Sequence, residues 1–331
     1  MKKKSKIAVI GGGSWATAII KMLGENLDSF HWWMRNEDTI NHIKKFGHNP
    51  NYISSAELKK TKINITSDIN EIVNEADCLI LAVPSAFLKK TLDSIIVPID
   101  NKFIVSAIKG IIPEHNTIIG DFLRDYYNLD VNNIAVLTGP CHAEEVAMER
   151  LSYLTIASQN IKKANWFAKK LSCRYIKTNV SNDIYGTEYA AIIKNIVALA
   201  AGICHGLGYG DNFQAVLISN AIREIKRFVD VVKPIKRDIK ESAYLGDLLV
   251  TAYSQFSRNR MFGEMIGRGY SIDAAHLKIK MVVEGYYAVK CIYETNLAQK
   301  INMPITEKVY QILYENKSPK NQMRLLSDGL N

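Results

Sequence analysis

The stretch "KIAVIGGGSWATAII" at residues 6–20 constrains the fold of this chain more than any other feature. Its first five residues are mostly apolar and predict a strand, whereas the residues after the glycines favour a helix. Gly11 and Gly13 lie between these two elements, and Ala16 lies within the predicted helix. The three residues have the G-x-G-x-x-G/A spacing. There the first glycine allows a tight turn, the second lets the backbone approach a pyrophosphate, and the helix N-terminus attracts that anion. The turn therefore predicts a dinucleotide-binding fold.

Short β-rich runs alternate with amphipathic segments from residue 6 to about residue 178. The runs are "KIAVI", "SFHWWM", "INIT", "DCLILAV", "FIVSAI", "NIAVLT", "YLTIAS" and "CRYIKT". Strands separated by helices need crossover connections, so this alternation predicts an α/β domain with a doubly wound, mainly parallel (Rossmann-like) sheet. We expect this dinucleotide-binding domain to span residues 1–180.

The β-rich runs stop at about residue 181. Beyond it, "TEYAAIIKNIVALAAGI" and "NFQAVLISNAIREIKRFVDVV" carry apolar residues at helical spacing. Ser, Asn and Asp in "VSND" at 180–183 are typical of a helix N-cap at the change of pattern. A chain of 331 residues is long enough for two cores. We therefore expect an all-helical domain for substrate and catalysis over residues 181–331.

Charge and hydropathy limit the partners and the compartment. The net charge is +9, partly from "KKKSK", "IKKANWFAKK" and "KPIKRDIK". These runs lack interleaved aromatic residues, so they favour a solvated basic surface that attracts anionic substrates over a nucleic-acid site. No apolar run approaches the roughly 20 residues that cross a bilayer, and glycines interrupt the N-terminus before a signal peptide forms. We expect a cytoplasmic protein without membrane insertion.

The five cysteines are scattered and form no CxxC pair. They are Cys78, Cys141, Cys173, Cys204 and Cys291. This pattern indicates reduced thiols rather than disulfides or a zinc centre, and we expect no metal site.

Residues after the predicted strands point to the cofactor, because open α/β sheets bind ligands at the carboxyl ends of their strands. Arg35 follows the second strand, where an arginine pairs with the 2′-phosphate of NADP. Glu37 and Asp38 come next and offer carboxylates to the ribose of NAD. "LAVPSAF" and "SAIKG" are expected to end the fourth and fifth strands, which places Lys109 in the same crevice. These residues therefore leave both NAD and NADP as candidate cofactors.

Lys194 is a single charge in the apolar helix pattern "YAAIIKNIVALAAGI". A buried ammonium is costly unless it is paired or its pKa is lowered, which makes Lys194 a candidate proton donor and acceptor. The alternative is a side chain that reaches solvent from a half-buried helix.

A polar set follows in "YLGDLLVTAYSQFSRNRMFG", residues 244–263. Asp247 and Thr251 are suited to orienting a hydroxyl group, and Arg258, between Ser257 and Asn259, to clamping a phosphate with its planar fork. Together with Lys194 this set predicts a substrate site.

The assembled motifs resemble those of the soluble, bacterial-type NAD(P)-dependent glycerol-3-phosphate dehydrogenases. The resemblance covers nearly the whole chain, in the order "GGGSWATA", "WMRN", "AVPS", "SAIKG", "TGPCHAEEVA", "IIKNIVALAAGICHGLGYGDN", "GDLLVT", "SRNRMFG" and "VVEGYYAV". It implies reversible reduction of dihydroxyacetone phosphate to sn-glycerol 3-phosphate, a supply step for glycerophospholipid synthesis.

The resemblance also implies individual roles. Lys194 matches the general acid/base, and Lys109 matches the lysine that touches both substrate and nicotinamide. Our own hypothesis is that Asp247 holds and orients Lys194. The matching substrate positions are Lys109, Gly139, Cys141, Lys194, Asp247, Thr251, Ser257, Arg258 and Asn259. The cofactor positions, with the turn glycines, are Gly11, Gly13, Ser14, Trp15, Arg35, Lys109, Ala143, Arg258, Val282 and Glu284.

One position departs from the family pattern, which usually has serine and phenylalanine where this chain has Cys141 and His142. A thiol donates only weakly, so we expect Cys141 to contact substrate through its backbone.

Two other readings remain open at this point. A ketopantoate-reductase-like or hydroxyacid dehydrogenase shares the glycine turn, a helical second domain and a catalytic lysine. A non-enzymatic NAD(P)-sensing module would use the fold to report redox state, and it would not need Lys194, Asp247 and Arg258 together. The apolar stretches of the helical half are also sufficient for the homodimer that we expect.

Overall fold

The computed structural model describes residues 6–279 and 281–331, so the lysines at positions 2–4 lie outside it. The chain divides into two compact units. The first contains the chain up to Ile108 together with Ile119–Ile184. The second contains Lys109–Ile118 and Tyr185–Asn331. The units are therefore not two consecutive halves of the sequence, because a short inner segment belongs to the second.

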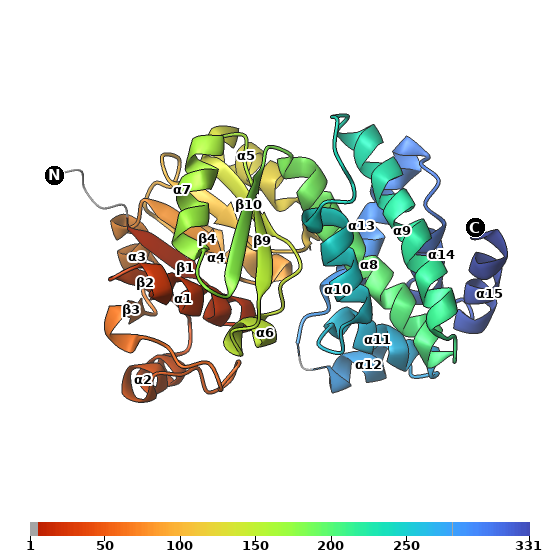
Figure 1. Cartoon of the computed structure of the whole chain (residues 1–331), viewed down its shortest axis with the longest axis horizontal. Helices are drawn as coiled ribbons and strands as arrows, with labels where there is room; N and C mark the ends of the chain where they lie inside the picture. Colours follow the sequence, from red (N-terminus) through yellow and green to blue (C-terminus); the bar gives the residue numbers. More distant parts are fainter. Residues whose placement is uncertain (1–5, 280) are drawn as a thin grey trace. The chain divides into compact units, whose positions relative to one another are not determined.

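An eight-stranded sheet forms the centre of the first unit, in the order β10-β9-β8-β5-β4-β1-β2-β3 (Figure 1). Neighbouring strands are parallel except for β8 and β9. The strands are β1 (Ile7–Ile10), β2 (Phe30–Trp33), β3 (Ile63–Thr66), β4 (Cys78–Leu81), β5 (Phe103–Ser106), β8 (Ile134–Thr138), β9 (Ser152–Ala157) and β10 (Ile176–Ser181). This confirms the predicted mainly parallel, doubly wound sheet.

The last strand lies later than the predicted run "CRYIKT". Cys173 and Ile176 form an isolated antiparallel bridge, so the chain turns back on itself there before β10 begins. The segment "LAVPSAF" predicted that the fourth strand ends at Pro84 and Ser85. Instead, β4 ends at Leu81, and Ser85 already begins a helix whose N-cap is Pro84.

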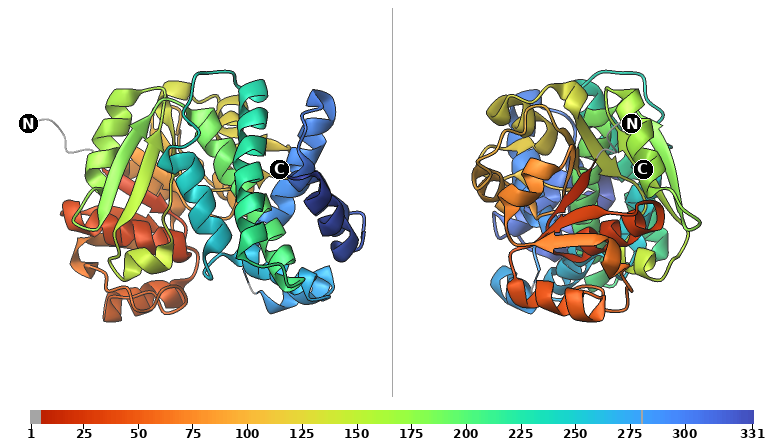
Figure 2. Two further views of the ribbon diagram at one scale, coloured as in Figure 1. Left: turned by 45° about the vertical axis from the view of Figure 1, so that its right-hand side comes forward. Right: turned by 90° about the vertical axis from the view of Figure 1, so that its left-hand side faces the viewer.

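Helices cover both faces of this sheet, as the right-hand view of Figure 2 shows. The helices are α1 (Ser14–Asn26), α2 (Glu37–Phe46), α3 (Ile69–Glu75), α4 (Ser85–Asp93), α5 (Ile119–Tyr127), α6 (Ala143–Ala147) and α7 (Ile161–Leu171). All four residues of β1, β2, β4 and β5 are buried, as expected for strands covered on both faces. Asparagine or aspartate N-caps begin α2, α3 and α7.

The sheet has a topological switch point between β1 and β4. From β1 the chain proceeds outward to β2 and β3, then returns to β4 on the other side of β1. Gly11 follows β1 with a φ of +137°, and a Cβ there would lie 2.3 Å from the carbonyl oxygen of Ala82. Only glycine fits this approach. The glycine turn thus lies where open α/β sheets bind their ligands.

The second unit is helical. Its helices are α8 (Ile184–Gly206), α9 (Asp211–Val232), α10 (Asp247–Tyr253), α11 (Arg258–Gly267), α12 (Ile272–Lys278), α13 (Glu284–Gln299), α14 (Pro304–Leu313) and α15 (Pro319–Gly329). Two short antiparallel strands, β6 (Ile111–Ile112) and β7 (Thr117–Ile118), were not predicted from the sequence. Ile111 and Ile118 are buried in the same apolar core as the helices.

Helix α8 is long and apolar enough to span a membrane by length and composition alone. However, 83% of its most apolar window is buried within the protein. This burial is typical of a core helix, and the apolar core of the second unit includes residues along much of α8 (Figure 1).

Glycines bring α8 and α11 into backbone contact. Gly202 and Gly206 on α8 face Gly263 and Gly267 on α11. A Cβ at any of the four would lie 2.0–2.3 Å from a backbone carbonyl oxygen of the other helix. The two helices therefore pack more closely than side chains would allow, and this packing fixes α11, which begins at Arg258, against α8.

Candidate functional site

Two side chains hold the glycine turn in the first unit. The indole nitrogen of Trp32 donates a hydrogen bond to the carbonyl oxygen of Gly11 at 2.6 Å. The side-chain amide of Asn49 donates to the carbonyl oxygen of Gly12 at 3.2 Å. Trp32 is fully buried, and its contact with the turn was not predicted from the motifs. A buried indole N–H requires a hydrogen-bond acceptor. A tryptophan in a strand expected to be buried was therefore the sequence signal for such a contact.

The start of α1 has the properties of an anion site. Gly13 is the N-cap and has no side chain with which to cap the helix, and the first turn contains no acidic residue. A Cβ on Gly13 would meet nothing within 4 Å. The N-terminus of α1 therefore presents backbone amides without a competing side-chain cap, and the turn fits the pyrophosphate of a dinucleotide.

The residues that were expected to choose between NAD and NADP follow β2. Arg35 is exposed, and Asn36 caps α2 by accepting a hydrogen bond from the backbone amide of Thr39 at 2.7 Å. Glu37 accepts a hydrogen bond from the hydroxyl of Ser67. Of the two carboxylates considered for the ribose, that of Glu37 therefore already has a partner, whereas the Arg35 side chain reaches solvent.

The loop after β8 carries three further predicted residues. Gly139 has a φ of +114°, and a Cβ there would lie 2.7 Å from the carbonyl oxygen of Tyr153. This backbone conformation requires glycine. Cys141 and Ala143, the latter at the start of α6, are both buried.

The second unit brings three predicted catalytic residues together. Lys194 on α8 is paired with Asp247, the first residue of α10. The ammonium of Lys109 lies 3.5 Å from the other carboxylate oxygen of Asp247. Lys194 is 4% exposed and Asp247 is 2% exposed, so Lys194 does not reach solvent as the alternative interpretation required. One buried carboxylate therefore serves two ammonium groups.

Two neighbours fix the backbone around this cluster. The side-chain amide of Asn195 donates to the carbonyl oxygen of Lys109 at 2.9 Å. The hydroxyl of Thr251 donates to the carbonyl oxygen of Asp247 at 2.7 Å, within the first turn of α10. Thr251 thus supports the backbone of Asp247.

Burial dominates the electrostatics of Lys194. It lowers the pKa of the ammonium to about 7, although the Asp247 carboxylate acts in the opposite direction. The positive charge of Lys109 adds to the lowering. Near neutral pH, Lys194 is therefore able both to release and to accept a proton.

The predicted "SRN" residues begin α11. Ser257 is the N-cap and accepts a hydrogen bond from the backbone amide of Arg260 at 3.3 Å. Asn259 accepts one from the backbone amide of Gly285 at 2.9 Å, which connects α11 with the start of α13. Arg258 donates to the carbonyl oxygen of Val282 at 3.1 Å. These two hydrogen bonds connect the start of α11 with Val282 and Gly285. Both lie beside Glu284, the predicted cofactor residue that begins α13.

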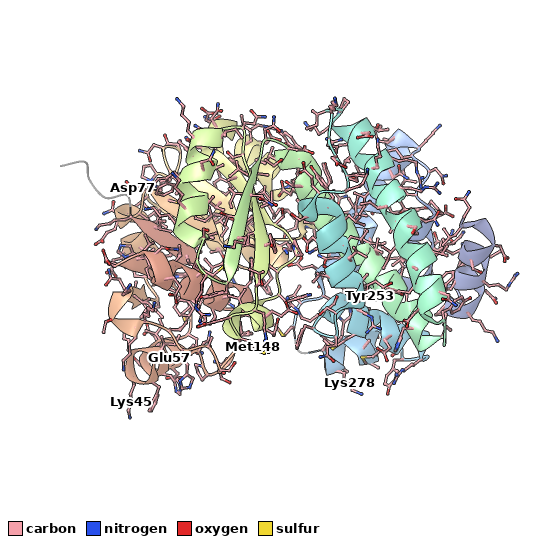
Figure 3. All side chains as sticks on the ribbon, in the orientation of Figure 1. Lys45, Glu57, Asp77, Met148, Tyr253 and Lys278 are labelled. Carbon is pink, nitrogen blue, oxygen red and sulfur yellow. The ribbon has the colours of Figure 1, made fainter. Side chains whose placement is uncertain are left out.

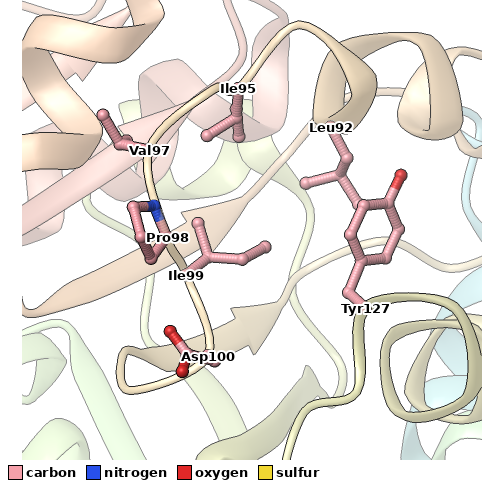
Figure 4. A pocket seen from close by; sticks show the side chains of 7 residues that line it. All are labelled: Leu92, Ile95, Val97, Pro98, Ile99, Asp100 and Tyr127. Carbon is pink, nitrogen blue, oxygen red and sulfur yellow. The ribbon is translucent and has the colours of Figure 1, made fainter.

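Arg258 also lines a cavity of about 550 Å³ within the second unit. A second cavity, of about 330 Å³, lies in the first unit between the end of α4 and Tyr127 (Figure 4). Its lining contains no predicted site residue. We therefore place the candidate chemistry at the Lys194–Asp247–Lys109 cluster and around Arg258.

The predicted residues fall into two groups, one in each unit. The first unit contains Gly11, Gly13, Ser14, Trp15, Arg35, Gly139, Cys141 and Ala143. The second contains Lys109, Lys194, Asp247, Thr251, Ser257, Arg258, Asn259, Val282 and Glu284. A doubly wound dinucleotide-binding unit combined with a helical unit that buries a lysine–carboxylate pair defines an NAD(P)-dependent oxidoreductase.

Comparisons with family models identify the particular family. The model of the NAD-dependent glycerol-3-phosphate dehydrogenase N-terminus matches residues 6–164, and that of the C-terminus matches residues 183–324. The chain belongs to the NAD-dependent glycerol-3-phosphate dehydrogenase family, which confirms the resemblance seen in its motifs.

Relatives and solved structures agree with this assignment. The glycerol-3-phosphate dehydrogenase (NAD(P)+) of Thermoanaerobacter sp. (strain X514) is 34% identical over 315 residues, covering 95% of this chain and 94% of that protein. The crystal structure of glycerol-3-phosphate dehydrogenase from Coxiella burnetii matches with a TM-score of 0.89 at 27% identity, covering 98% of each chain. A putative 2-dehydropantoate 2-reductase from Enterococcus faecalis matches with a TM-score of only 0.53 at 16% identity, over 97% of this chain and 99% of that one. The last similarity concerns the fold alone.

Proposed function

We propose that this chain catalyses the reversible, NAD(P)-dependent reduction of dihydroxyacetone phosphate to sn-glycerol 3-phosphate, and so supplies glycerophospholipid synthesis. The observation that carries this proposal is the buried Lys194–Asp247 pair with Lys109 beside it, in a member of this family. A ketone reduction needs one proton donor at the carbonyl oxygen, and Lys194 has the pKa for that role.

The residues of the first unit fit the cofactor. Gly11, Gly13 and the first amides of α1, at Ser14 and Trp15, would hold the pyrophosphate. Arg35 would pair with the 2′-phosphate of NADP, which supports use of NADP beside NAD. Bound nicotinamide supplies the hydride in the reducing direction. Ala143 in the first unit, and Lys109, Arg258, Val282 and Glu284 in the second, complete the proposed cofactor set.

The second unit would bind the substrate and move the proton. Arg258 offers a planar donor fork to the phosphate, with Ser257 and Asn259 beside it. Thr251, Gly139 and the backbone of Cys141 complete the proposed substrate set. Lys194 donates its proton to the carbonyl oxygen during reduction and takes it back from the hydroxyl during oxidation. Asp247 holds the ammonium in place, and Lys109 helps to keep its pKa low.

Initial rates with dihydroxyacetone phosphate, measured in parallel with NADH and NADPH, test this function. Ketopantoate with the same cofactors serves as the comparison substrate for the related architecture. We expect turnover of dihydroxyacetone phosphate with at least one cofactor and none of ketopantoate. Turnover of ketopantoate alone, or cofactor binding without turnover of either substrate, would contradict the proposal.

We also propose that the protein is a cytoplasmic homodimer. Exposed apolar side chains on the second unit support association, among them Leu249, Tyr253 and Phe256, of which Tyr253 is labelled in Figure 3. Light scattering coupled to size-exclusion chromatography would give twice the chain mass of 37.3 kDa for a dimer.

A further inference from the structure

Two histidines, neither of them assigned a role above, meet at the C-terminal end of α2. His42 lies in the last turns of α2, and His48 follows the C-cap Gly47. Their Nε2 atoms are 3.0 Å apart, and both side chains are partly buried. The ring of Phe46 packs against that of His42 with 4.6 Å between the centroids, and this contact limits the movement of the His42 ring.

The two imidazoles are hydrogen-bonded through their Nε2 atoms, but their ring axes do not lie on one line. A straight N–H···N contact of this length would separate the ring centroids by roughly 5.3 Å. The observed centroids are 4.7 Å apart, with the ring planes at 81°. At least one ring axis therefore lies off the line that joins the two Nε2 atoms, and two nitrogens directed at one common point also give this spacing.

A common metal ion in place of the shared proton would also satisfy both nitrogens. Imidazole nitrogens bind transition metals at about 2.0–2.1 Å, so two ligands at a right angle lie about 3 Å apart. A tetrahedral ion such as Zn²⁺ would hold them at roughly 3.3–3.4 Å. The observed spacing fits the right-angled geometry that Cu²⁺ and Ni²⁺ prefer.

We propose that His42 and His48 form a binding site for a divalent transition metal of the Cu²⁺ and Ni²⁺ type, with water completing the coordination. The site lies beside the C-terminus of α2, where the partial negative charge of the helix favours a cation. Lys44 and Lys45, in the same last turn, act against this and favour a moderate affinity. Lys45, labelled in Figure 3, has its ammonium 5.0 Å from the centroid of the Phe46 ring.

The site neighbours the segment that supports the glycine turn. Asn49, the residue after His48, donates to the carbonyl oxygen of Gly12 and to the hydroxyl of Thr17 at 2.9 Å. A bound metal would join α2 to this segment directly. The metal site takes no part in the proposed reaction, so the outcome of a test of one does not decide the other.

Titration calorimetry with NiCl₂ on the full, untagged chain tests the proposal. We expect one Ni²⁺ per chain and a loss of affinity on the order of tenfold or more in His42→Gln and in His48→Gln. His205→Gln is the matched control, because His205 is an exposed histidine of the second unit and should leave the affinity unchanged. Cu²⁺ should bind more tightly than Ni²⁺, and Zn²⁺ more weakly.

Unfolding in urea and NADPH binding, measured on the same variants, separate loss of the site from loss of the fold. The two glutamine variants should keep wild-type values in both measurements while they lose the metal. The proposal is overturned if the wild type binds no Ni²⁺, if His205→Gln weakens binding as much as the paired variants do, or if His42→Gln and His48→Gln bind like the wild type.

Discussion

At the scale of single residues, the proposed chemistry depends on how Lys194 is buried. Its position in the sequence showed one charge in an apolar helix, which was enough to predict a functional lysine. Its partner was less apparent, because Asp247 is 53 residues away and Lys109 is 138 residues from Asp247. Their pairing depends on packing in the second unit, and motifs indicated it only through family resemblance.

Replacement of Lys194 tests its role as the proton donor. Lys194→Met keeps the apolar stem and removes the ammonium, so kcat should fall by about 10²–10⁴-fold, while NADPH still binds. Lys226→Met is the matched control, because Lys226 also pairs with an aspartate, Asp230, but is half exposed. Near-normal turnover in Lys194→Met would exclude this lysine from proton transfer.

The pH dependence of both reaction directions follows from the lowered pKa. Reduction needs the ammonium form of Lys194, so kcat/KM for reduction should fall as the pH rises through about 7. Oxidation needs the neutral amine, so its rate should rise over the same range. Lys109→Met removes a like charge and should move the inflection to higher pH. An inflection that stays in place would contradict this coupling.

The lowered pKa of Lys194 also determines how the free energy of unfolding changes with pH. Because the folded pKa is below the unfolded value, the unfolded chain binds more protons between about pH 7 and the ordinary lysine pKa. Lys194 should therefore make stability rise with pH in that window. Urea unfolding of the wild type and Lys194→Met across it should show this slope only in the wild type.

Arg258 should act mainly through the substrate phosphate. Loss of a charge-assisted hydrogen bond costs about 1.5–3 kcal/mol, so Arg258→Ala should raise the KM for dihydroxyacetone phosphate by roughly tenfold or more. Arg258→Lys keeps the charge without the planar fork and should recover only part of the loss. Steady-state kinetics with saturating cofactor give the comparison. A fall in kcat at unchanged KM would argue against phosphate binding.

At the scale of elements, the alternating pattern predicted the sheet, but it did not predict how two helices approach each other. The glycines at 202, 206, 263 and 267 have no distinctive signal within a single helix pattern, where glycine is merely a weak helix former. Their role emerges only when α8 and α11 lie backbone to backbone. The two-residue strands β6 and β7 were also too short to produce a periodic pattern.

The close packing of α8 and α11 predicts the effect of one methyl group. A Cβ on Gly263 would lie 2.2 Å from the carbonyl oxygen of Leu199, which is backbone and has little room to move. Gly263→Ala should therefore destabilise the second unit by about 1–3 kcal/mol or more, despite the better helix propensity of alanine.

Gly24→Ala on α1 is the control for this substitution. Its nearest neighbours would lie 3.8 Å from the new Cβ, so alanine should be neutral or stabilising by up to about 1 kcal/mol. Thermal unfolding followed by circular dichroism compares the two variants. Equal stability of Gly263→Ala and the wild type would show that the helices can separate without cost.

At the scale of the whole molecule, two cores were predictable from length and pattern, but the path of the chain between them was not. The segment Lys109–Ile118 comes from within the first half of the sequence and belongs to the second unit. It carries Lys109 to the Lys194–Asp247 pair and buries Ile111 and Ile118 in the helical core. Nothing in the local pattern of this segment identifies its partners, because they lie far along the chain.

Because Lys109–Ile118 belongs to the second unit, substitutions in this early segment should destabilise the second unit. The double variant Ile111→Ala/Ile118→Ala removes buried side chains from the helical core, at about 2–5 kcal/mol each. All four tryptophans lie in the first unit, so their fluorescence reports on that unit, whereas circular dichroism also reports on the helices of the second. In urea, the helical signal of the double variant should therefore be lost at a lower urea concentration than in the wild type, ahead of the fluorescence change.

Ile104→Ala, in β5, is the control and should shift the fluorescence change to lower urea concentration instead. If the double variant shifted only the fluorescence, the segment would belong energetically to the sheet.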